Sequence, residues 1–360
     1  MTETNNKNLI LSVKDLEVKF KVRDRVLTAI RNISMDFEEG KVVAIVGESG
    51  SGKSVFTKTF TGMLEVNGEI SNGTIMFEGQ NLTKITKDSE WEKIRGKKIA
   101  TVFQDPMTSL NPVKTIGDQI SEVIIKHQGK SKQEAKELAI ELMGKVGIVD
   151  PENRFDEYPF MYSGGMRQRI VIAIALACRP RILICDEPTT ALDVTIQAQI
   201  IRLIKDLAEE YGFTTIYITH DLGVVANVAD VVAVMYAGQI IEYGGVEEVF
   251  YDARHPYTWG LLSSLPQLGE KGEELFAIRG TPPSLFEKVK GDAFAPRNNY
   301  ALKIDYEQEP PFFKVTDTHY AKTWLLDPRA PKVEPPAAVK NLHERMTALT
   351  SKGGIYGERE

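Results

Sequence analysis

The segment Gly47–Ser54, with the sequence Gly-Glu-Ser-Gly-Ser-Gly-Lys-Ser, constrains this chain more than any other. It matches the pattern G-x-x-x-x-G-K-[ST], a loop that cradles phosphate groups. The apolar run Val42–Val46 ahead of it predicts a buried strand, and Val55–Met63 behind it predicts a helix. The glycines let backbone N–H groups approach a polyphosphate, and the helix N-terminus adds the positive end of its dipole. The chain is therefore expected to contain an α/β nucleotide-binding domain.

Two side chains of this loop have separate expected tasks. Lys53 can reach the β- and γ-phosphates, and the Ser54 hydroxyl can bind Mg²⁺. The residues expected to contact the nucleotide run from the loop into the helix: Gly47, Glu48, Ser49, Gly50, Ser51, Gly52, Lys53, Ser54 and Val55. A glycine-rich turn that matches by accident is the alternative, and the strand ahead of the loop argues against it.

Composition excludes several classes of function. The chain has 360 residues, is 42% hydrophobic and 26% charged, and suits a soluble globular protein with a proper core. Its net charge of −6 lacks the basic surplus of a nucleic-acid binder, so no nucleic-acid partner is expected. It contains no apolar run of membrane-spanning length, and Met1–Lys7 does not resemble a signal peptide. The two cysteines, Cys178 and Cys185, fall in apolar runs, which fits a reducing cytoplasm.

The order of strand and helix patterns predicts a mostly parallel sheet with helices on both faces. Alternation of apolar and polar residues from 9 to 46 predicts a small antiparallel sheet ahead of the P-loop. Helical spacing over 115–148, with Ser131 and Glu134 forming a capping box, predicts a helical region. Frequent prolines from about residue 255 onward predict a smaller, loop-rich extension.

Polar residues stand where predicted buried strands end. Asp186 ends one strand, and a Mg²⁺ ion shared with Ser54 would neutralise its carboxylate. Glu187 follows directly and can polarise a water that attacks the γ-phosphate, while His220 can hold that water. Gln104 ends a third strand, and its amide oxygen can bind Mg²⁺. The predicted catalytic residues are therefore Glu187 and His220, and the predicted metal ligands are Ser54, Gln104 and Asp186; a strand-end turn with solvated acids is the alternative.

A second phosphate cradle is predicted at Ser163-Gly164-Gly165, where a serine N-cap and two unobstructed amides open a helix over Met166–Ala177. An ordinary helix start is the alternative. Two cradles in one chain indicate either that each faces a different nucleotide or that two chains share them.

Together these residues resemble the motif set of an ABC-type ATPase, across residues 10 to about 250. The correspondences are Gly47–Ser54 with Walker A, Gln104 with the Q-loop, Tyr162–Arg169 with the signature, Asp186 and Glu187 with Walker B and its catalytic glutamate, Ala191–Asp193 with the D-loop, and His220 with the switch histidine. Met166 stands where glutamine is commonest, a variant familiar in peptide permeases.

Three further segments narrow the resemblance to the ATPases of oligopeptide and dipeptide permeases: Gln104–Pro112, His255–Leu262 and Gly280–Pro283. It implies a P-loop ABC-type nucleotide-binding domain over residues 9–254, with an antiparallel β subdomain and a helical subdomain at about 105–178. A small loop-rich C-terminal extension over 255–330 and a tail over 331–360 would follow.

The resemblance also implies a mechanism and partners. Two cassettes would pair head to tail and hold ATP between Lys53 of one and the signature of the other. The residues expected on the partner's ATP are Ser163, Gly164, Gly165, Met166 and Asp193. Phe20 is the best candidate to stack on adenine, and Tyr162 and Phe37 are weaker ones. For Phe20, a role as a core strand residue is an equal alternative. The implied partners are a paralogous ATPase subunit rather than an identical one, two transmembrane permease subunits, and indirectly an extracytoplasmic peptide-binding protein. The protein would sit peripherally at the cytoplasmic face of the cell membrane.

One departure concerns an iron–sulfur centre. The family often carries cysteines around an Ala-Pro-Arg-Cys stretch, but Arg297 is followed here by Asn298, and nearby positions hold Asp292, Asp305 and Ala321. Because no thiolate is available there, the usual cluster cannot form, and we expect an extension without metal, held by packing and polar contacts.

Other functions remain open at this stage. The same motor can serve import of dipeptides, nickel or another small solute. A soluble ABC ATPase not coupled to transport usually has two cassettes or a coiled-coil insert, and this chain has neither. A regulatory subunit without turnover would not need Glu187 and His220. The sequence does not determine which peptides are carried, whether the partner cassette is identical, or whether both composite sites hydrolyse ATP.

Overall fold

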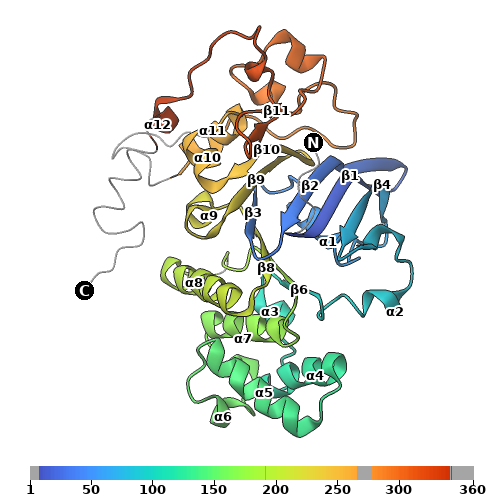
Figure 1. Ribbon diagram of the computed structural model, residues 1–360, viewed down its shortest axis with the longest axis vertical. Helices are drawn as coiled ribbons and strands as arrows, with labels where there is room; N and C mark the ends of the chain where they lie inside the picture. The colour runs from blue at the N-terminus through green and yellow to red at the C-terminus, as the bar shows by residue number, and fades with distance from the viewer. Residues whose placement is uncertain (1–7, 191, 266–277, 341, 343–360) are drawn as a thin grey trace, which may run out of the picture.

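A computed structural model describes residues 8–190, 192–265, 278–340 and 342. Its centre is an eight-stranded sheet with the order β11-β12-β10-β9-β3-β8-β7-β6 (Figure 1). Five of these strands, from β9 to β6, are parallel, and the remaining three extend the sheet in antiparallel fashion. The strand bounds are β3 Val42–Val46, β6 Ile99–Val102, β7 Ile182–Asp186, β8 Thr214–Thr219, β9 Val231–Tyr236, β10 Gln239–Gly245, β11 Phe313–Lys314 and β12 Tyr320–Ala321. The prediction of a mostly parallel sheet is confirmed.

A second, four-stranded sheet with the order β2-β1-β4-β5 lies beside the first. Its strands are β1 Leu9–Val22, β2 Arg25–Glu38, β4 Gly68–Phe77 and β5 Gln80–Asn81, all paired antiparallel. Buried residues such as Leu11 and Val13 alternate with more exposed neighbours, because only one face of this sheet meets the core. The predicted antiparallel sheet is confirmed.

Helices cover both faces of the central sheet. Ile184 and Ile218 face a core that includes helix α1, Lys53–Lys58, and the antiparallel sheet. Their chain neighbours Cys185 and Tyr217 face a different core, built with α7, Gly164–Leu176, and α8, Val194–Tyr211. Because successive side chains of a strand point to opposite faces, the sheet separates α1 from α7.

The helical region forms the lower part of the molecule in Figure 1. Its elements are α3 Pro106–Ser109, α4 Ile116–Gln128, α5 Lys132–Lys145, α6 Pro151–Arg154, η3 Pro159–Met161 and α7; α2 Asp88–Trp91 and η2 Leu82–Lys84 precede it. The predicted capping box is confirmed, since Ser131 accepts from the Glu134 backbone and the Glu134 carboxylate accepts from Ser131. The predicted helix start at Ser163 is confirmed as well.

The helix after the P-loop is shorter than predicted. A helix was expected over Val55–Met63, but α1 begins at Lys53 and ends at Lys58, and turns follow. The Thr59 hydroxyl donates to the Phe56 carbonyl at 2.5 Å, and Gly62 has a φ of +62° with the Trp91 ring against it. Side-chain bonds to the backbone and a left-handed glycine both favour ending a helix.

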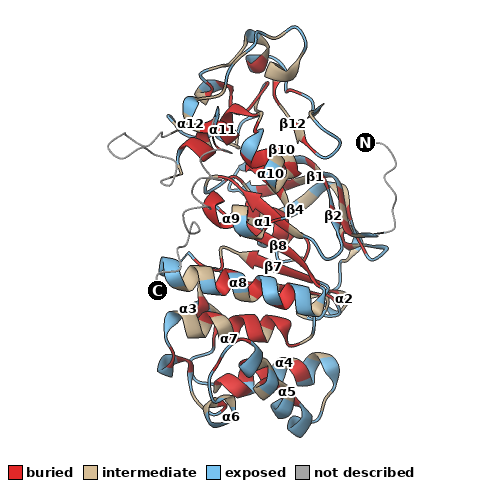
Figure 2. Cartoon of the chain, turned by 60° about the vertical axis from the view of Figure 1, so that its left-hand side comes forward, coloured by how far each residue is buried: buried red, intermediate tan, exposed pale blue. Residues whose placement is uncertain are grey.

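The C-terminal extension shares a core with the sheet rather than standing apart. Tyr257 and Phe294 pack in one cluster with Val232 and Val234 of β9, and Figure 2 shows the buried residues continuing from the sheet into this region. Strand β12 pairs with β10. The remaining elements of this end are α9 Leu222–Val228, α10 Val246–Tyr251, α11 Pro256–Ser263, η5 Ala295–Arg297, η6 Lys303–Tyr306, η7 Trp324–Leu326 and α12 Ala337–Lys340. The part of the predicted tail beyond residue 342 lies outside the described residues.

The positions where cysteines were considered are buried and engaged in polar contacts. Asp292, Asn298 and Asp305 each accept a hydrogen bond from a backbone N–H two or three residues away in sequence. Deeper still, the His319 ring nitrogen lies 2.9 Å from a Glu242 oxygen, with both side chains fully buried. Among the described residues no group of three His, Cys, Asp or Glu side chains is placed to hold a metal ion. Strand pairing and these contacts hold the extension; its metal-free state stays a prediction.

Candidate nucleotide-binding site

The P-loop connects β3 to α1 and has the backbone geometry that its glycines allow. Gly47 has a φ of +152°, and a Cβ there would lie 2.1 Å from the Met235 carbonyl oxygen, so only glycine fits. Lys53 is 6% exposed. Its Nζ donates to the carbonyls of Gly47 at 2.8 Å and Glu48 at 3.0 Å. Burial lowers the pKa of Lys53, while Glu187 and Asp186 oppose this shift. Phosphate oxygens would replace these carbonyls and keep the ammonium paired.

Asp186 and Ser54 face each other across the site. The Ser54 Oγ donates to the Asp186 Oδ1 at 3.0 Å. Burial raises the pKa of Asp186, and the hydrogen bond from Ser54 only partly offsets the effect. A half-buried carboxylate beside a hydroxyl is an oxygen-donor set that Mg²⁺ prefers, so these residues fit the ion. When bound, the ion would neutralise charge on the β- and γ-phosphates.

Glu187 turns away from Asp186 although the two residues are adjacent. Its φ is +49°, a left-handed conformation that is rare for glutamate and that collects at functional sites. One carboxylate oxygen lies 3.3 Å from the His220 Nδ1, and the other accepts from the Thr190 hydroxyl at 3.0 Å. The backbone N–H of Glu187 donates to the Ile218 carbonyl at 3.0 Å. A carboxylate oriented by two neighbours can polarise an attacking water.

The predicted strand-end residues meet at one edge of the sheet. Strand β7 pairs with β6 on one side and with β8 on the other, all parallel. Gln104 follows β6, Asp186 ends β7, His220 follows β8, and the P-loop follows β3, which pairs with β8. Gln104 and His220 are exposed. In parallel sheets, ligands bind beyond the carboxyl ends of the strands, and this edge carries all of the predicted hydrolytic residues.

The second cradle opens helix α7. Ser163 Oγ accepts from the Met166 N–H at 3.4 Å, and both Ser163 and Gly164 are exposed. A Cβ on Gly165 would lie 2.6 Å from the Ile196 side chain, so close packing against α8 requires glycine there. Asp193 caps α8 by accepting from the Ile196 N–H at 3.0 Å. Ala191 of the predicted D-loop lies outside the described residues.

The structure does not bring this second cradle to the P-loop of its own chain. Helices α1 and α7 lie on opposite faces of the central sheet, as Figure 1 also shows. The backbone amides after Ser163 therefore do not reach a phosphate that Lys53 of the same chain would bind. The role of Ser163 toward a nucleotide in another chain stays a prediction.

Phe20 occupies a core position. The residue is 7% exposed and belongs to the cluster beneath the antiparallel sheet. A Cβ on Gly68 would lie 2.5 Å from its ring, so the neighbouring strand approaches it closely. Stacking of this ring on adenine stays a prediction.

Sequence analysis missed the residues that support the P-loop from outside. Glu48 is bound by Arg297 and by Tyr257, both from the extension. Each belongs to a short segment that was noticed as typical of the permease ATPases, without a role being assigned. Arg297 lies 249 residues from Glu48, and Tyr257 lies 209 residues from it. At such separations no local pattern predicts a contact, so their position in these family-typical segments was the only available signal.

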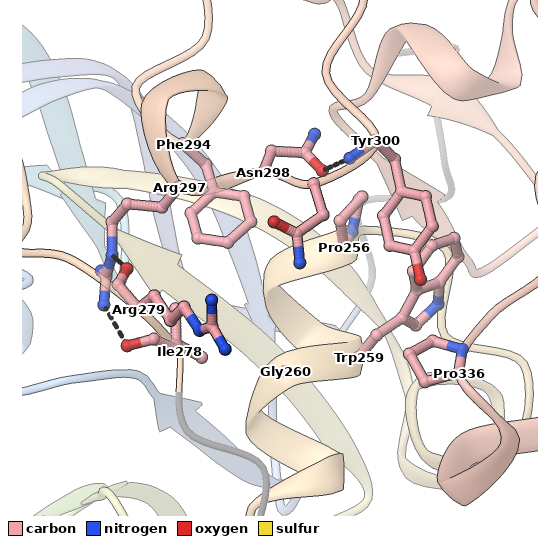
Figure 3. A pocket seen from close by; sticks show the side chains of 11 residues that line it. Pro256, Trp259, Gly260, Ile278, Arg279, Phe294, Arg297, Asn298, Tyr300 and Pro336 are labelled. Atoms are coloured by element: carbon pink, nitrogen blue, oxygen red, sulfur yellow. Dashed lines mark hydrogen bonds between the residues drawn. The ribbon is translucent and has the colours of Figure 1, made fainter.

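A cavity of about 70 Å³ lies beside Arg297, between Trp259, Tyr300 and Pro336 (Figure 3). Liquid water takes about 30 Å³ per molecule, so this space suits a few waters and is too small for a nucleotide. The P-loop edge therefore stays the predicted nucleotide site.

The P-loop, the carboxylate pair Asp186 and Glu187, and the exposed helix start at Ser163 define the cassette of an ABC-type ATPase. Two family profiles match the chain: "ABC transporter" over residues 30–190, and "Oligopeptide/dipeptide transporter, C-terminal region" over residues 241–304. The chain belongs to the ABC transporter family, among the ATP-binding subunits of oligopeptide and dipeptide transporters, and it is an ATPase.

Relatives match over nearly their whole length. The chain is 68% identical to the oligopeptide transport ATP-binding protein AmiE of Streptococcus pneumoniae, over 95% of this chain and 97% of the relative. It is 58% identical to the oligopeptide transport ATP-binding protein OppD of Bacillus subtilis, over 98% of each chain. The dipeptide transport ATP-binding protein DppD of Lactococcus lactis is 58% identical, over 91% of this chain and 93% of the relative.

Among solved structures, the dimeric ATP-binding cassette MJ0796 in a post-hydrolysis state with ADP and Pi superposes with a TM-score of 0.59. The two sequences are 28% identical, and the aligned region covers 66% of this chain and 98% of the MJ0796 chain. CbiO1 of Clostridium perfringens, part of the transporter complex cbiONQ, is 29% identical with a TM-score of 0.59, over 68% of this chain and 91% of its own.

Proposed function

We propose that this chain is the ATP-hydrolysing subunit that energises a membrane importer of oligopeptides. The observation that carries the proposal is whole-length similarity to oligopeptide transport ATP-binding proteins, combined with a sheet edge where Ser54 contacts Asp186 and Glu187 contacts His220. The substrate class comes from the relatives, since selection of a peptide would take place in other subunits.

The hydrolytic step follows from the residues at the sheet edge. Lys53 binds the terminal phosphates, and Ser54, Asp186 and Gln104 are the proposed ligands of Mg²⁺. Glu187 orients and polarises the attacking water, with Thr190 and His220 fixing its carboxylate. Phosphoryl transfer needs positioning and charge stabilisation more than covalent chemistry, and these groups supply both.

Pairing with a second cassette is part of the proposal. The exposed Ser163 cradle and Asp193 would contact ATP held by the P-loop of a paralogous ATPase subunit, and that subunit's signature would contact ATP on Lys53. Binding of ATP would close the pair, and hydrolysis would reopen it. The exposure of Ser163 and Gly164, on the other side of the sheet from α1, supports this arrangement.

A patch of exposed apolar side chains supports contact with membrane subunits. Its members are Met107, Phe160 and Met161, exposed by 57 to 67%. The Arg167 guanidinium donates to the Pro159 carbonyl at 2.8 Å and contacts the Met107 sulfur, which places the two halves of the patch side by side. Exposed apolar patches mark interaction surfaces.

In each cassette of the pair, this patch would receive one short helix from the cytoplasmic face of one permease subunit. None of the described helices is both long and apolar enough to cross a bilayer. By similarity to ATP-binding subunits of membrane transporters, the proposed location is peripheral, at the cytoplasmic face of the cell membrane, and the extracytoplasmic peptide-binding protein would be an indirect partner.

A second substrate class also has support among the relatives. The dipeptide transport protein of Lactococcus lactis has the same identity to this chain, 58%, as the oligopeptide protein of Bacillus subtilis. Dipeptide import is therefore the second candidate function. One uptake experiment with both oligopeptides and dipeptides distinguishes the two.

The test is uptake by cells in which this chain is replaced by Glu187→Gln. The variant keeps the shape of the side chain but loses the carboxylate, so ATP turnover should fall by about a thousandfold while ATP binding is retained. Uptake of labelled oligopeptides of four to six residues should stop. Thr190→Val removes only the hydroxyl that donates to Glu187. Its loss of ATP turnover should be smaller, because the Glu187 carboxylate itself remains.

Loss of dipeptide uptake with oligopeptide uptake unchanged would replace the first candidate with the second. Uptake of both at the wild-type rate by the Glu187→Gln cells would contradict the proposed function.

A further inference from the structure

Glu48, the second residue of the P-loop, is clamped by a side chain from the C-terminal extension. Arg297 Nη1 donates to Glu48 Oε2 at 2.7 Å, and Nη2 donates to Oε1 at 2.9 Å. Arg297 is 5% exposed and Glu48 is 28% exposed, so the pair is largely shielded from solvent. Two parallel bonds of this kind fix geometry as well as charge.

The backbone of Glu48 is held as well. Its N–H donates to the Tyr257 hydroxyl at 2.8 Å, and the Tyr257 ring lies against Tyr236 with centroids 4.6 Å apart. The Glu48 carbonyl accepts from Lys53 Nζ, the group that phosphates require. The extension thus fixes the side chain and the N–H of the residue whose carbonyl Lys53 must release when a nucleotide binds.

A longer segment reinforces this contact. We call residues 278–297 the C-terminal strap. Arg297 Nε donates to the Arg279 carbonyl at 3.0 Å, which closes the strap on itself (Figure 3). The Leu285 carbonyl accepts from the Thr28 N–H of β2 at 3.0 Å. Pro282, Pro283 and Leu285 also line a cavity of about 20 Å³ whose other wall is Glu48–Ser51 and β9 with its turn. The strap therefore touches the outer side of the P-loop at two places.

Stability alone does not account for a shielded ion pair at this position. Removing two charges from water is unfavourable, and apolar side chains of similar size often stabilise a fold as well or better. What the pair adds is a defined position for Glu48, next to Gly47 and within reach of Lys53.

We infer that Arg297 is a positioning residue for ATP: through Glu48 it holds the P-loop in the conformation that receives the phosphates. The C-terminal extension and the nucleotide site are then energetically coupled. Coupling of this kind is reciprocal, so nucleotide binding stabilises the strap to the same degree as the strap favours nucleotide binding.

The test measures MgADP affinity of the full-length chain by titration calorimetry, which avoids turnover. Arg297→Ala should weaken the affinity by about tenfold, within the usual range for coupled sites. Arg297→Lys should recover only part of it, because an ammonium cannot form two parallel bonds to one carboxylate. Arg329→Ala, which removes an exposed ion pair with Asp327 in the same extension, is the matched control and should leave the affinity unchanged.

A double variant separates positioning from general damage. Once Arg297 is alanine, Glu48→Gln should cause little additional loss, because the two residues act as a unit. Hydrogen exchange supplies a second readout: MgADP should slow exchange in residues 278–297 of the wild type, and this protection should be much reduced in Arg297→Ala. Thermal unfolding in parallel establishes that each variant is folded.

A folded Arg297→Ala chain with an affinity within twofold of wild type and unchanged strap protection would overturn the inference. An equal loss in Arg329→Ala would do so too, since it would show a nonspecific effect. Where Arg297→Ala does not fold, Glu48→Gln alone replaces it, with a severalfold loss of affinity expected and wild-type affinity overturning the inference.

Discussion

The two proposed phosphate cradles of this chain differ in how they are supported. The P-loop is enclosed: Lys53 is buried, Gly47 fits against the Met235 carbonyl, and Glu48 is bound from outside by Arg297. The cradle at Ser163 is exposed to solvent. Its Gly165 is required by close packing against Ile196 of α8. If both bind phosphate, the first cradle is complete within a single chain, whereas the second, with Ser163 and Gly164 exposed, would receive its phosphate from another chain.

This difference predicts which assay should detect a mutation in each cradle. Damage to the enclosed cradle should be visible in the isolated chain as lost nucleotide binding. Damage to the open cradle should be invisible there and appear only in turnover by an assembled pair.

Lys53→Ala should abolish most nucleotide binding by the isolated chain. The ammonium makes charge-assisted bonds to phosphate in a shielded site, so its loss should raise the Kd for MgATP by roughly a thousandfold, or about 4 kcal/mol. Titration calorimetry measures this directly. Lys41→Ala, which removes an exposed lysine just ahead of β3, is the control and should bind normally. Normal binding by Lys53→Ala would mean that the P-loop is not the nucleotide site.

Ser163→Ala should have the opposite profile. Binding of MgATP to the isolated chain should stay within twofold, while ATP turnover by the assembled complex should fall by about a hundredfold, as expected when one donor to a developing negative charge is lost. Ser131→Ala is a matched control, because Ser131 caps α5 of the same subdomain. Equal loss of turnover in both variants would show that helix capping, and not phosphate contact, explains the effect.

Asp292→Asn should change how the stability of the fold depends on pH. Asp292 lies in the C-terminal strap, the segment that contacts the P-loop. Burial raises the pKa of Asp292 from 3.8 to about 6. The folded state therefore holds a proton that the unfolded state releases first, and stability falls as pH rises from about 4 to 6. Asparagine removes this penalty, so the variant should gain up to about 3 kcal/mol at pH 7.5 and little at pH 4.

Thermal unfolding at the two pH values measures this gain. Wild-type affinity for MgADP is expected to persist, because Asp292 contacts the strap backbone and not the P-loop. A gain of the same size at both pH values would contradict the account of a buried, protonated carboxyl.

Much of this site could be predicted because it rests on local patterns. Each hydrolytic residue directly follows an apolar run, and the run itself predicts a strand whose carboxyl end joins the others at one edge. Asp186, Glu187 and His220 were located in this way, and the structure brings them together with Ser54. The cap at Ser131 is equally local.

The remainder depends on contacts between distant parts of the chain. The pair of Arg297 with Glu48 spans 249 residues, and neither residue carries a local pattern that names the other. Strands β11 and β12 are two residues each, too short for any alternation, so their addition to the central sheet could not be read in advance. The length of α1 was overestimated because hydroxyl bonds to backbone carbonyls end it before its apolar pattern does.

The central claim is that one chain supplies half of each ATP site and that hydrolysis needs a second cassette. The most direct test measures the specific ATPase rate of the full-length chain, shown to be monomeric by light scattering, while a second cassette is added. The account predicts a rate near background for the monomer and a saturable rise as pairs form. A constant specific rate, the same with and without the second cassette, would contradict it.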